Sequence, residues 1–195
     1  MRLKEIATIR TGLVLSRKKA ALHEPVKHCY KQITLKSFFN SITLHSQYFD
    51  DFFSVEEIDH TYLSQIGDIV VRLREPNTAV YIDESSAGLV IPSLMAIVRV
   101  QDSRVDNAFL AYYLNSGVVK KALERELKGT TIPMIKTKDL EDLAIVLPPI
   151  EEQKKVVALM KLTQKELYLL DKLKQEKQRL SQAVLDTIIQ QYKED

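Results

Sequence analysis

The chain has 195 residues, of which 45% are hydrophobic and 28% charged, which is typical of one globular domain with a core. Its single cysteine, Cys29, excludes an intramolecular disulfide framework. No apolar run reaches the roughly 20 residues of a membrane span, and the segment 1–5 lacks the apolar core of a signal peptide. We therefore expect a cytoplasmic protein that does not bind a membrane.

The net charge of +2 hides an uneven distribution along the chain. Segment 17–36 contains six basic residues and one acidic residue, and segment 120–138 contains six basic and two acidic residues. Segment 50–59 has five acidic residues and no basic one. Segregated charge of this kind can present a basic face to phosphates. The alternative is that these segments are solvated loops and helix faces.

Short strand-like runs separated by turns fill the chain up to residue 100. Leu3, Ile6 and Ile9 fit a short helix or the entry to a strand, which Gly12 closes. The acidic segment 50–59 also carries phenylalanines, so we interpret it as a helical surface turn over a core rather than a metal site. Further β-prone runs occupy residues 31–35, 69–73, 79–82, 89–91 and 94–100. Together they predict a strand-rich, antiparallel core.

Helical spacing replaces this pattern after residue 105. Apolar residues between 109 and 123 recur at helical intervals, and Asp106 and Asn107 are plausible caps. Residues 129–131 form a turn, residues 137–140 a short helix and residues 143–147 a last strand.

The remainder of the chain is predicted to be one long helix. Pro149 suits the first turn, and Glu151 and Glu152 complement the helix N-terminus. No glycine or proline follows, so the helix would have about 40 residues and a length of about 60 Å. Apolar positions about 3.6 residues apart form one stripe: Val156, Met160, Leu167, Leu170, Leu173, Leu180, Val184 and Ile188.

A stripe this long requires a second helix, and the sequence supplies no other long one. We therefore expect a homodimer through a parallel or antiparallel helix pair. Thr163 and Lys177 interrupt the stripe, which argues against a strict leucine zipper. The fold class is α+β: a strand-rich mixed domain over residues 1–147, followed by a coiled-coil-forming helix over residues 148–195.

Motifs for catalysis or metal binding are missing from the sequence. It has no P-loop, no dinucleotide-binding fingerprint, no H-E-x-x-H and no nucleophile motif. The Asn/Asp-Pro-Pro-Tyr/Phe tetrapeptide of amino-methyltransferases is also absent. His23, His28 and Cys29 do not match the spacing of zinc ligands, so we expect a partly buried His28–Cys29 pair instead. No metal and no cofactor are expected in this chain.

The most specific motif lies between residues 137 and 157, where Thr-Lys-Asp-Leu-Glu-Asp-Leu precedes Ile-Val-Leu-Pro-Pro-Ile-Glu-Glu-Gln-Lys-Lys-Val-Val. It resembles the specificity subunits of type I restriction-modification systems. In that family a strand ending in Leu-Pro-Pro-Leu-Glu-Glu-Gln leads from the target recognition domain into a long helix. Weaker matches in the expected order are residues 3–7 with Gly12, 67–71, 109–116 and 129–132.

This resemblance implies a non-catalytic subunit that reads double-stranded DNA for methyltransferase (M) subunits and a restriction (R) subunit. S-adenosylmethionine, ATP and Mg²⁺ are then expected on those partners. Family members usually carry two recognition domains and two helices, whereas this sequence has one of each and looks like a half-subunit. A homodimer would read the same half-site twice, so its target would be an interrupted palindrome.

Candidate DNA-binding residues come from the basic segments. Arg72 and Arg74 follow a strand and precede the Glu75–Pro76 turn, where arginine can reach guanine or phosphate. For each candidate the alternative is an exposed cation that contributes little. The full set is Arg17, Lys18, Lys19, Arg72, Arg74, Lys128, Thr130, Thr131, Lys136 and Lys138.

Two other functions are compatible with the same sequence. One is a coiled-coil interaction or regulatory protein that uses this scaffold without sequence-specific DNA binding. The other is a nuclease or methyltransferase, against which the missing motifs count.

Overall fold

The structure, a computed structural model, describes all residues except 22, 39–41, 76, 127–133, 192 and 194–195. It contains two compact units, Met1–Lys154 and Lys155–Asp195, which are described separately. The first is a mixed α and β unit with antiparallel sheets, and the second consists of most of one long helix, so the α+β class is confirmed. The first turn of that helix packs with the globular unit, which therefore extends to Lys154. The sequence-based boundary after residue 147 lies just before the expected start of the helix.

A four-stranded antiparallel sheet forms the centre of the first unit. Its strands are β1 (Ala7–Thr11), β4 (Ile69–Arg72), β5 (Ala79–Tyr81) and β6 (Met95–Val100), in the order β1-β6-β4-β5. The continuous apolar run of β4 reflects burial on both faces. Ile69 and Val71 pack into one core cluster, and Val70 packs into another.

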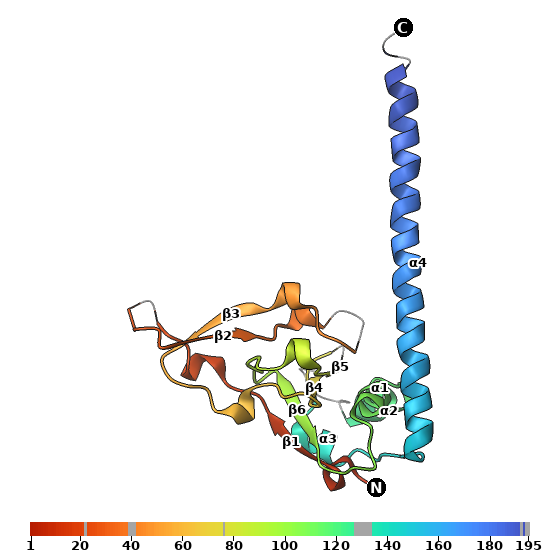
Figure 1. The fold of residues 1–195 in the computed structure, drawn as a ribbon. Coiled ribbons are helices and arrows are strands. Elements are labelled where there is room, and N and C mark those ends of the chain that lie inside the picture. Colours follow the sequence, from red (N-terminus) through yellow and green to blue (C-terminus); the bar gives the residue numbers. More distant parts are fainter. Residues whose placement is uncertain (22, 39–41, 76, 127–133, 192, 194–195) are drawn as a thin grey trace. The chain divides into compact units, whose positions relative to one another are not determined.

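Different elements cover the two faces of this sheet. The helices α1 (Asn107–Leu114), α2 (Gly117–Glu126) and α3 (Thr137–Glu141) contribute Leu110, Leu123 and Leu140 to the cluster around Ile69. On the other face, Ile33 and Ile91 pack with Val70. Strands β2 (His28–Gln32) and β3 (Asp50–Ser54) form a separate antiparallel ribbon (Figure 1).

The predicted helical turn over residues 50–59 is wrong, because its first half is strand β3. Alternate residues of a strand face opposite sides, so Phe52 is buried while Phe53 is exposed. The acidic charge is balanced across the ribbon, where Asp51 pairs with Lys31 at 2.7 Å. Composition alone could not indicate this partner because it lies on another strand.

Two other predicted strands are reduced to isolated bridges. In segment 89–91, Val90 bridges Gln32 and Leu63, and in segment 143–147, Ala144 bridges Arg2. The predicted strand over residues 31–35 begins earlier, at His28, and gives way to a 3₁₀ turn at Leu35. Segments 89–91 and 143–147 are apolar because Leu89 and Ile91 are buried in one core cluster, and Leu143 and Ile145 in another, not because they pair as strands.

The helical segment after residue 105 divides into α1 and α2. Asp106 caps α1 by accepting a hydrogen bond from Phe109 N at 2.9 Å, which confirms its predicted role. Asn115 ends α1, and its amide exchanges hydrogen bonds of 3.0 and 2.7 Å with both backbone groups of Ala79 in β5. This side chain therefore ties the helix pair to the sheet.

A buried ion pair fixes the turn that leads into β4. The Asp68 carboxylate is 2% exposed and receives two hydrogen bonds from Arg99 of β6, at 2.7 and 2.8 Å. It also accepts from Gln65 N at 2.9 Å, while Gly67 adopts a positive φ of 90° in the same turn. Removing one partner of such a pair leaves a buried charge uncompensated.

The long helix α4 runs from Ile150 to Gln191, 42 residues, or about 63 Å. It begins one residue after Pro149, whose carbonyl accepts hydrogen bonds from Glu152 N and Gln153 N. This confirms the predicted helix. Among the described residues, no helix is both long and apolar enough to cross a membrane.

Gln153 joins the first turn of α4 to the rest of the globular unit. Its side chain is fully buried, and its Oε1 accepts from Asp106 N at 2.8 Å. Its Nε2 donates to Arg104 O at 2.9 Å and to Pro148 O at 2.8 Å. One amide thus satisfies a backbone N–H and two carbonyls where the chain enters α1 and α4.

We expect Gln153→Leu to lower the free energy of unfolding by about 2–4 kcal/mol, because it leaves these three backbone groups unpaired. Gln153→Glu keeps an acceptor for Asp106 N but loses both donors, so it should also be destabilising. Urea unfolding measures the effect, and Gln190→Leu on exposed α4 surface is the matched control. Equal stabilities of Gln153→Leu and this control would contradict the assigned role.

Candidate nucleic-acid interface

Three stretches that carry candidate cations meet at the same end of the central sheet. Gly12, which leads toward Arg17, donates a hydrogen bond to Met95 O at 2.9 Å, and Leu73 donates to Leu94 O at 3.0 Å. Ile135, next to Lys136, donates to Leu73 O at 2.9 Å. Segments far apart in sequence are thus held side by side around the start of β6.

Gly12 makes this arrangement possible by close backbone approach. A Cβ atom at this position would lie 2.3 Å from Pro92 O and 2.4 Å from Ile91 O. Leu13 continues the contact, donating to Ile91 O at 2.7 Å and accepting from Ser93 N at 2.8 Å. A side chain at residue 12 would push the backbone around Gly12 away from the backbone of residues 91–93.

The segment Arg17–Lys19 lies next to the end of β3. Lys18 pairs with Glu56, and its carbonyl accepts hydrogen bonds from Val55 N and the Ser54 hydroxyl. Lys19 forms a bridge with Ser54. Arg17 and Lys19 are exposed and make no ion pair with any described residue. Of the three cations, Lys18 is the one already neutralised within the chain.

Arg72 and Arg74 differ in their surroundings. Arg72 ends β4 and is half-buried, and its Nε is buried without an acceptor among the described residues. Asn77 holds the following turn by donating to Arg72 O at 3.3 Å and Leu73 O at 3.1 Å. Arg74 is exposed and bridges Met134. A buried donor that has no acceptor within the protein is a candidate for a hydrogen bond to a ligand.

Lys136 and Lys138 lie at the start of α3, and both are exposed. Asp139 accepts a hydrogen bond from Lys136 N at 2.8 Å, which fixes the start of the helix. Asp142, at the end of α3, accepts from Lys4 and Arg2, and the hydrogen bond from Lys4 lowers the pKa of Asp142. The bridge between Arg74 and Met134 and the hydrogen bond from Ile135 N to Leu73 O bring Lys136 close to the end of β4. Lys138 instead lines a cavity of about 420 Å³ with Asp142.

The other predicted contacts, Lys128, Thr130 and Thr131, lie outside the described residues. The structure adds Lys27 to the group near Lys19, because Lys27 N donates to Ser54 O at 3.0 Å. Lys27 is one of the six basic residues of segment 17–36, but nothing in the sequence around it marks it as a candidate DNA-binding residue.

The prediction that His28 and Cys29 form a partly buried pair is wrong, because adjacent residues of strand β2 face opposite sides. His28 is half-buried and stacks on Tyr30 with ring centroids 6.1 Å apart, whereas Cys29 is exposed on the other face. Within the described part of the chain, no group of three or more histidine, cysteine or acidic residues is arranged to hold a metal ion.

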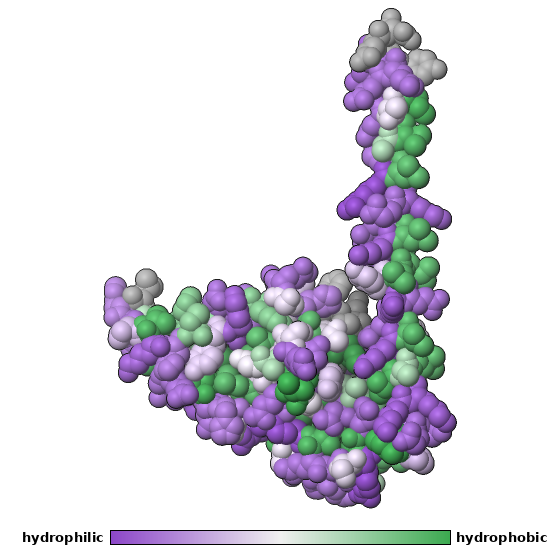
Figure 2. All heavy atoms as spheres, viewed as in Figure 1, coloured by the Kyte–Doolittle hydropathy of each residue, from purple (hydrophilic) through white to green (hydrophobic). Residues whose placement is uncertain are grey.

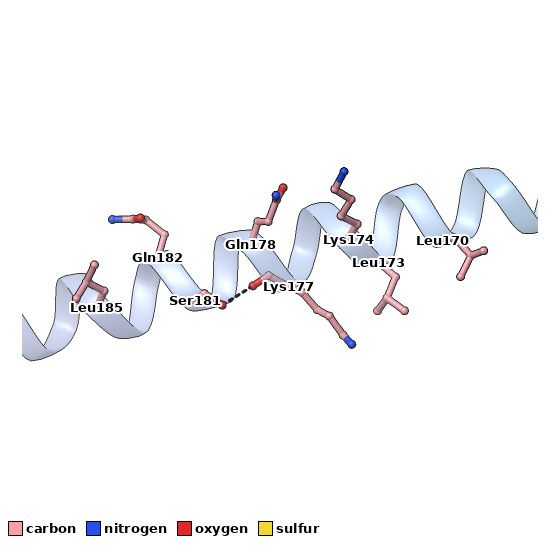
Figure 3. A pocket seen from close by; sticks show the side chains of 8 residues that line it. All are labelled: Leu170, Leu173, Lys174, Lys177, Gln178, Ser181, Gln182 and Leu185. Atoms are coloured by element: carbon pink, nitrogen blue, oxygen red, sulfur yellow. Dashed lines mark hydrogen bonds between the residues drawn. The ribbon is translucent and has the colours of Figure 1, made fainter. Parts of the chain in front are cut away.

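The predicted stripe on α4 is exposed along its whole length. Its eight residues, from Val156 to Ile188, are each between 37% and 65% exposed, and Figure 2 shows the apolar stripe along the helix. An open groove of about 750 Å³ lies along this helix, and Figure 3 shows that three of its lining residues, Leu170, Leu173 and Lys177, extend to the same side. The sequence stripe omitted further exposed apolar residues: Leu159, Leu162, Leu169, Leu185 and Ile189.

Comparison with known proteins identifies the family of this chain. The family model for the type I restriction modification DNA specificity domain matches residues 1–180. A protein of Methanocaldococcus jannaschii that is described as the MjaX type I restriction enzyme specificity subunit is 35% identical to this chain over 94 residues. These residues are 48% of this chain and 21% of that protein.

Two solved structures share the fold. The HsdS subunit from Thermoanaerobacter tengcongensis has a TM-score of 0.68 at 15% identity, over 96% of this chain and 47% of that one. A chain from a structure of complex assembly and conformational transition of the type I R-M system has a TM-score of 0.63 at 23% identity, over 95% and 44%.

The chain therefore spans less than half the length of each of these three relatives. The family model nevertheless covers both the globular unit and most of α4. The chain belongs to the type I restriction modification DNA specificity domain family.

Proposed function

We propose that this chain is a non-catalytic, sequence-reading subunit of a type I restriction-modification enzyme. The observation that carries this proposal is the convergence of Gly12, Leu73 and Ile135 at the start of β6, since each leads into a basic segment. One end of the sheet can then offer several cations to the same stretch of double-stranded DNA. Family membership supports DNA as the ligand.

The cations would have different roles. The backbone of Arg72 is fixed because it is part of β4, and its Nε lacks an acceptor among the described residues. Arginine reads guanine through two parallel hydrogen bonds in the major groove, so Arg72 and the adjacent Arg74 are assigned to base contacts. Arg17, Lys19 and Lys136 are assigned to phosphates, which position the unit without reading sequence.

The exposed stripe of α4 is assigned to a second copy of this chain. The described residues form one globular unit and one long helix, and an apolar stripe of this length is stabilised when another helix covers it. An antiparallel pair would place two identical reading units at opposite ends. The pair would also dock methyltransferase subunits, which bind S-adenosylmethionine, and a restriction subunit that uses ATP and Mg²⁺.

Charge substitutions should separate reading from positioning. Arg72→Ala should weaken binding to the preferred DNA by about 1–3 kcal/mol and relax the choice of one base pair. Lys136→Ala should weaken binding to all sequences and reduce the slope of log K against log salt by about 1. Fluorescence anisotropy over a salt series measures both, with Lys161→Ala on α4 as control. Unchanged binding after combined replacement of Arg72, Arg74 and Lys136 would refute the assignment.

The chain should be dimeric in solution at micromolar concentration. The double variant Leu170→Glu/Val184→Glu places two charges on the stripe and should shift the mass from dimer to monomer in light scattering, because burial of unpaired carboxylates is costly. Gln175→Glu/Gln190→Glu adds the same charge on the opposite side of the helix and should remain dimeric. A wild-type monomer, or equal masses for the two variants, would contradict the helix pairing.

The DNA target should be an interrupted palindrome. A two-fold symmetric dimer presents identical surfaces, so both half-sites must have the same sequence on opposite strands. Genome-wide mapping of methylated sites in cells that express this chain with its methyltransferase subunit tests this directly. Two different half-sites would exclude the symmetric dimer, and random or absent methylation would instead favour an interaction protein without sequence-specific DNA binding.

A further inference from the structure

The outer face of the β2–β3 ribbon carries an exposed phenylalanine. Phe53 is 45% exposed, although its neighbours Phe52 and Ser54 are buried in the unit. In the ribbon register Phe53 lies opposite Cys29, which is also exposed. The pairing that places Phe52 in the core therefore forces Phe53 outward.

Two basic segments border Phe53. Ala20 donates a hydrogen bond to Phe53 O at 2.9 Å, and Lys19 bridges Ser54 on one side of β3. On the other side, Lys27 donates to Ser54 O at 3.0 Å. Phe53 thus lies in the middle of three adjacent backbone segments, the outer two of which carry lysines.

The two ends of the ribbon differ in charge. At the end near Gln32, Lys31 is paired with Asp51, and this hydrogen bond raises the pKa of Lys31. At the Phe53 end, Lys19 and Lys27 form no ion pair with the residues that the structure describes. Lys18, at this same end, is paired with Glu56, so Lys19 and Lys27 are the lysines beside Phe53 that remain for a ligand.

These features fit DNA better than a protein partner. The exposed apolar surface is small, Phe53 with Val26 next to Lys27, whereas the centre of a protein interface is depleted in charged residues. The major groove is about 12 Å wide and admits a two-stranded ribbon. Phenylalanine is one of the side chains that contact the thymine methyl group there, and lysines bind the bordering phosphates.

We propose that the β2–β3 ribbon is a specificity-determining element in which Phe53 packs on the 5-methyl group of a thymine in the half-site, while Lys19 and Lys27 contact flanking phosphates. This inference rests on the proposed function, because it names the chemical group that the reading unit recognises. It adds an apolar contact to the hydrogen bonds assigned to Arg72 and Arg74.

Replacement of thymine by uracil removes only the methyl group and so tests the contact. The chain, assembled with its methyltransferase subunits, should bind about fourfold more weakly when uracil replaces one particular thymine, the equivalent of one buried methyl group. Phe53→Ala should bind thymine and uracil DNA equally well. Ile66→Ala, another exposed apolar position, should keep the discrimination, and thermal unfolding checks that both variants fold.

Cys29 provides a second, independent readout because it is the single cysteine and lies opposite Phe53. Specific DNA should slow its alkylation by a maleimide in the same assembly, followed by mass spectrometry of the Cys29 peptide. Unspecific DNA of equal length is the control and should slow the reaction less.

The outcomes separate the two proposals. If specific binding persists but no thymine position responds to uracil, or Phe53→Ala retains the discrimination, or Cys29 reacts at an unchanged rate, the ribbon assignment is overturned and the proposed function stands. A Phe53→Ala variant that loses only its methyltransferase subunits assigns this surface to protein and also overturns it. Lack of sequence-specific binding by the wild-type assembly refutes both.

Discussion

The backbone at the start of β6 is the constraint on which the arrangement of the candidate DNA-binding segments depends. Leu94 and Met95 accept hydrogen bonds from Leu73 and Gly12, and Leu73 in turn accepts one from Ile135. Main-chain groups make all three contacts, so the segments stay together whatever side chains they carry beyond this point. The same strand holds Arg99, whose ion pair with Asp68 fixes the other end of β4. A rigid centre from which the candidate cations extend is compatible with the proposed reading of DNA.

Electrostatic pairing within the chain selects which cations remain for a ligand. Glu56 neutralises Lys18, Asp51 neutralises Lys31, and Asp142 is paired with Arg2 and Lys4. The acidic segment 50–59 thus lies against part of the basic segment 17–36 rather than repelling the ligand from a distant surface. Because these pairs are largely exposed, each contributes little stability. Within segment 17–36 they leave Arg17, Lys19, Lys27 and Lys36 without an ion pair among the described residues.

The sequence predicted those elements whose burial pattern repeats locally. Strands β4 and β6 are apolar at nearly every position because both faces of the sheet are covered, and α4 shows a helical period over more than ten turns. Strand β3 was mistaken for a helical turn because its pairing partner is about 20 residues away in sequence. The break between α1 and α2 depends on Asn115, whose contacts with Ala79 are tertiary. The basic segments were identified from composition, but their convergence depends on strand order, and the exposure of Phe53 depends on its register with Cys29.

The joint made by Gln153 has a consequence for how such proteins can diversify. Its three partners are the backbone groups of Asp106, Arg104 and Pro148, and no side chain other than that of Gln153 takes part in these hydrogen bonds. A globular unit with a different surface can therefore be grafted onto the same helix by recombination, provided that its loop before α1 keeps the same main-chain path. This attachment does not depend on the side chains at the surface of the globular unit, so under the proposed function whole units could be exchanged without changing the helix.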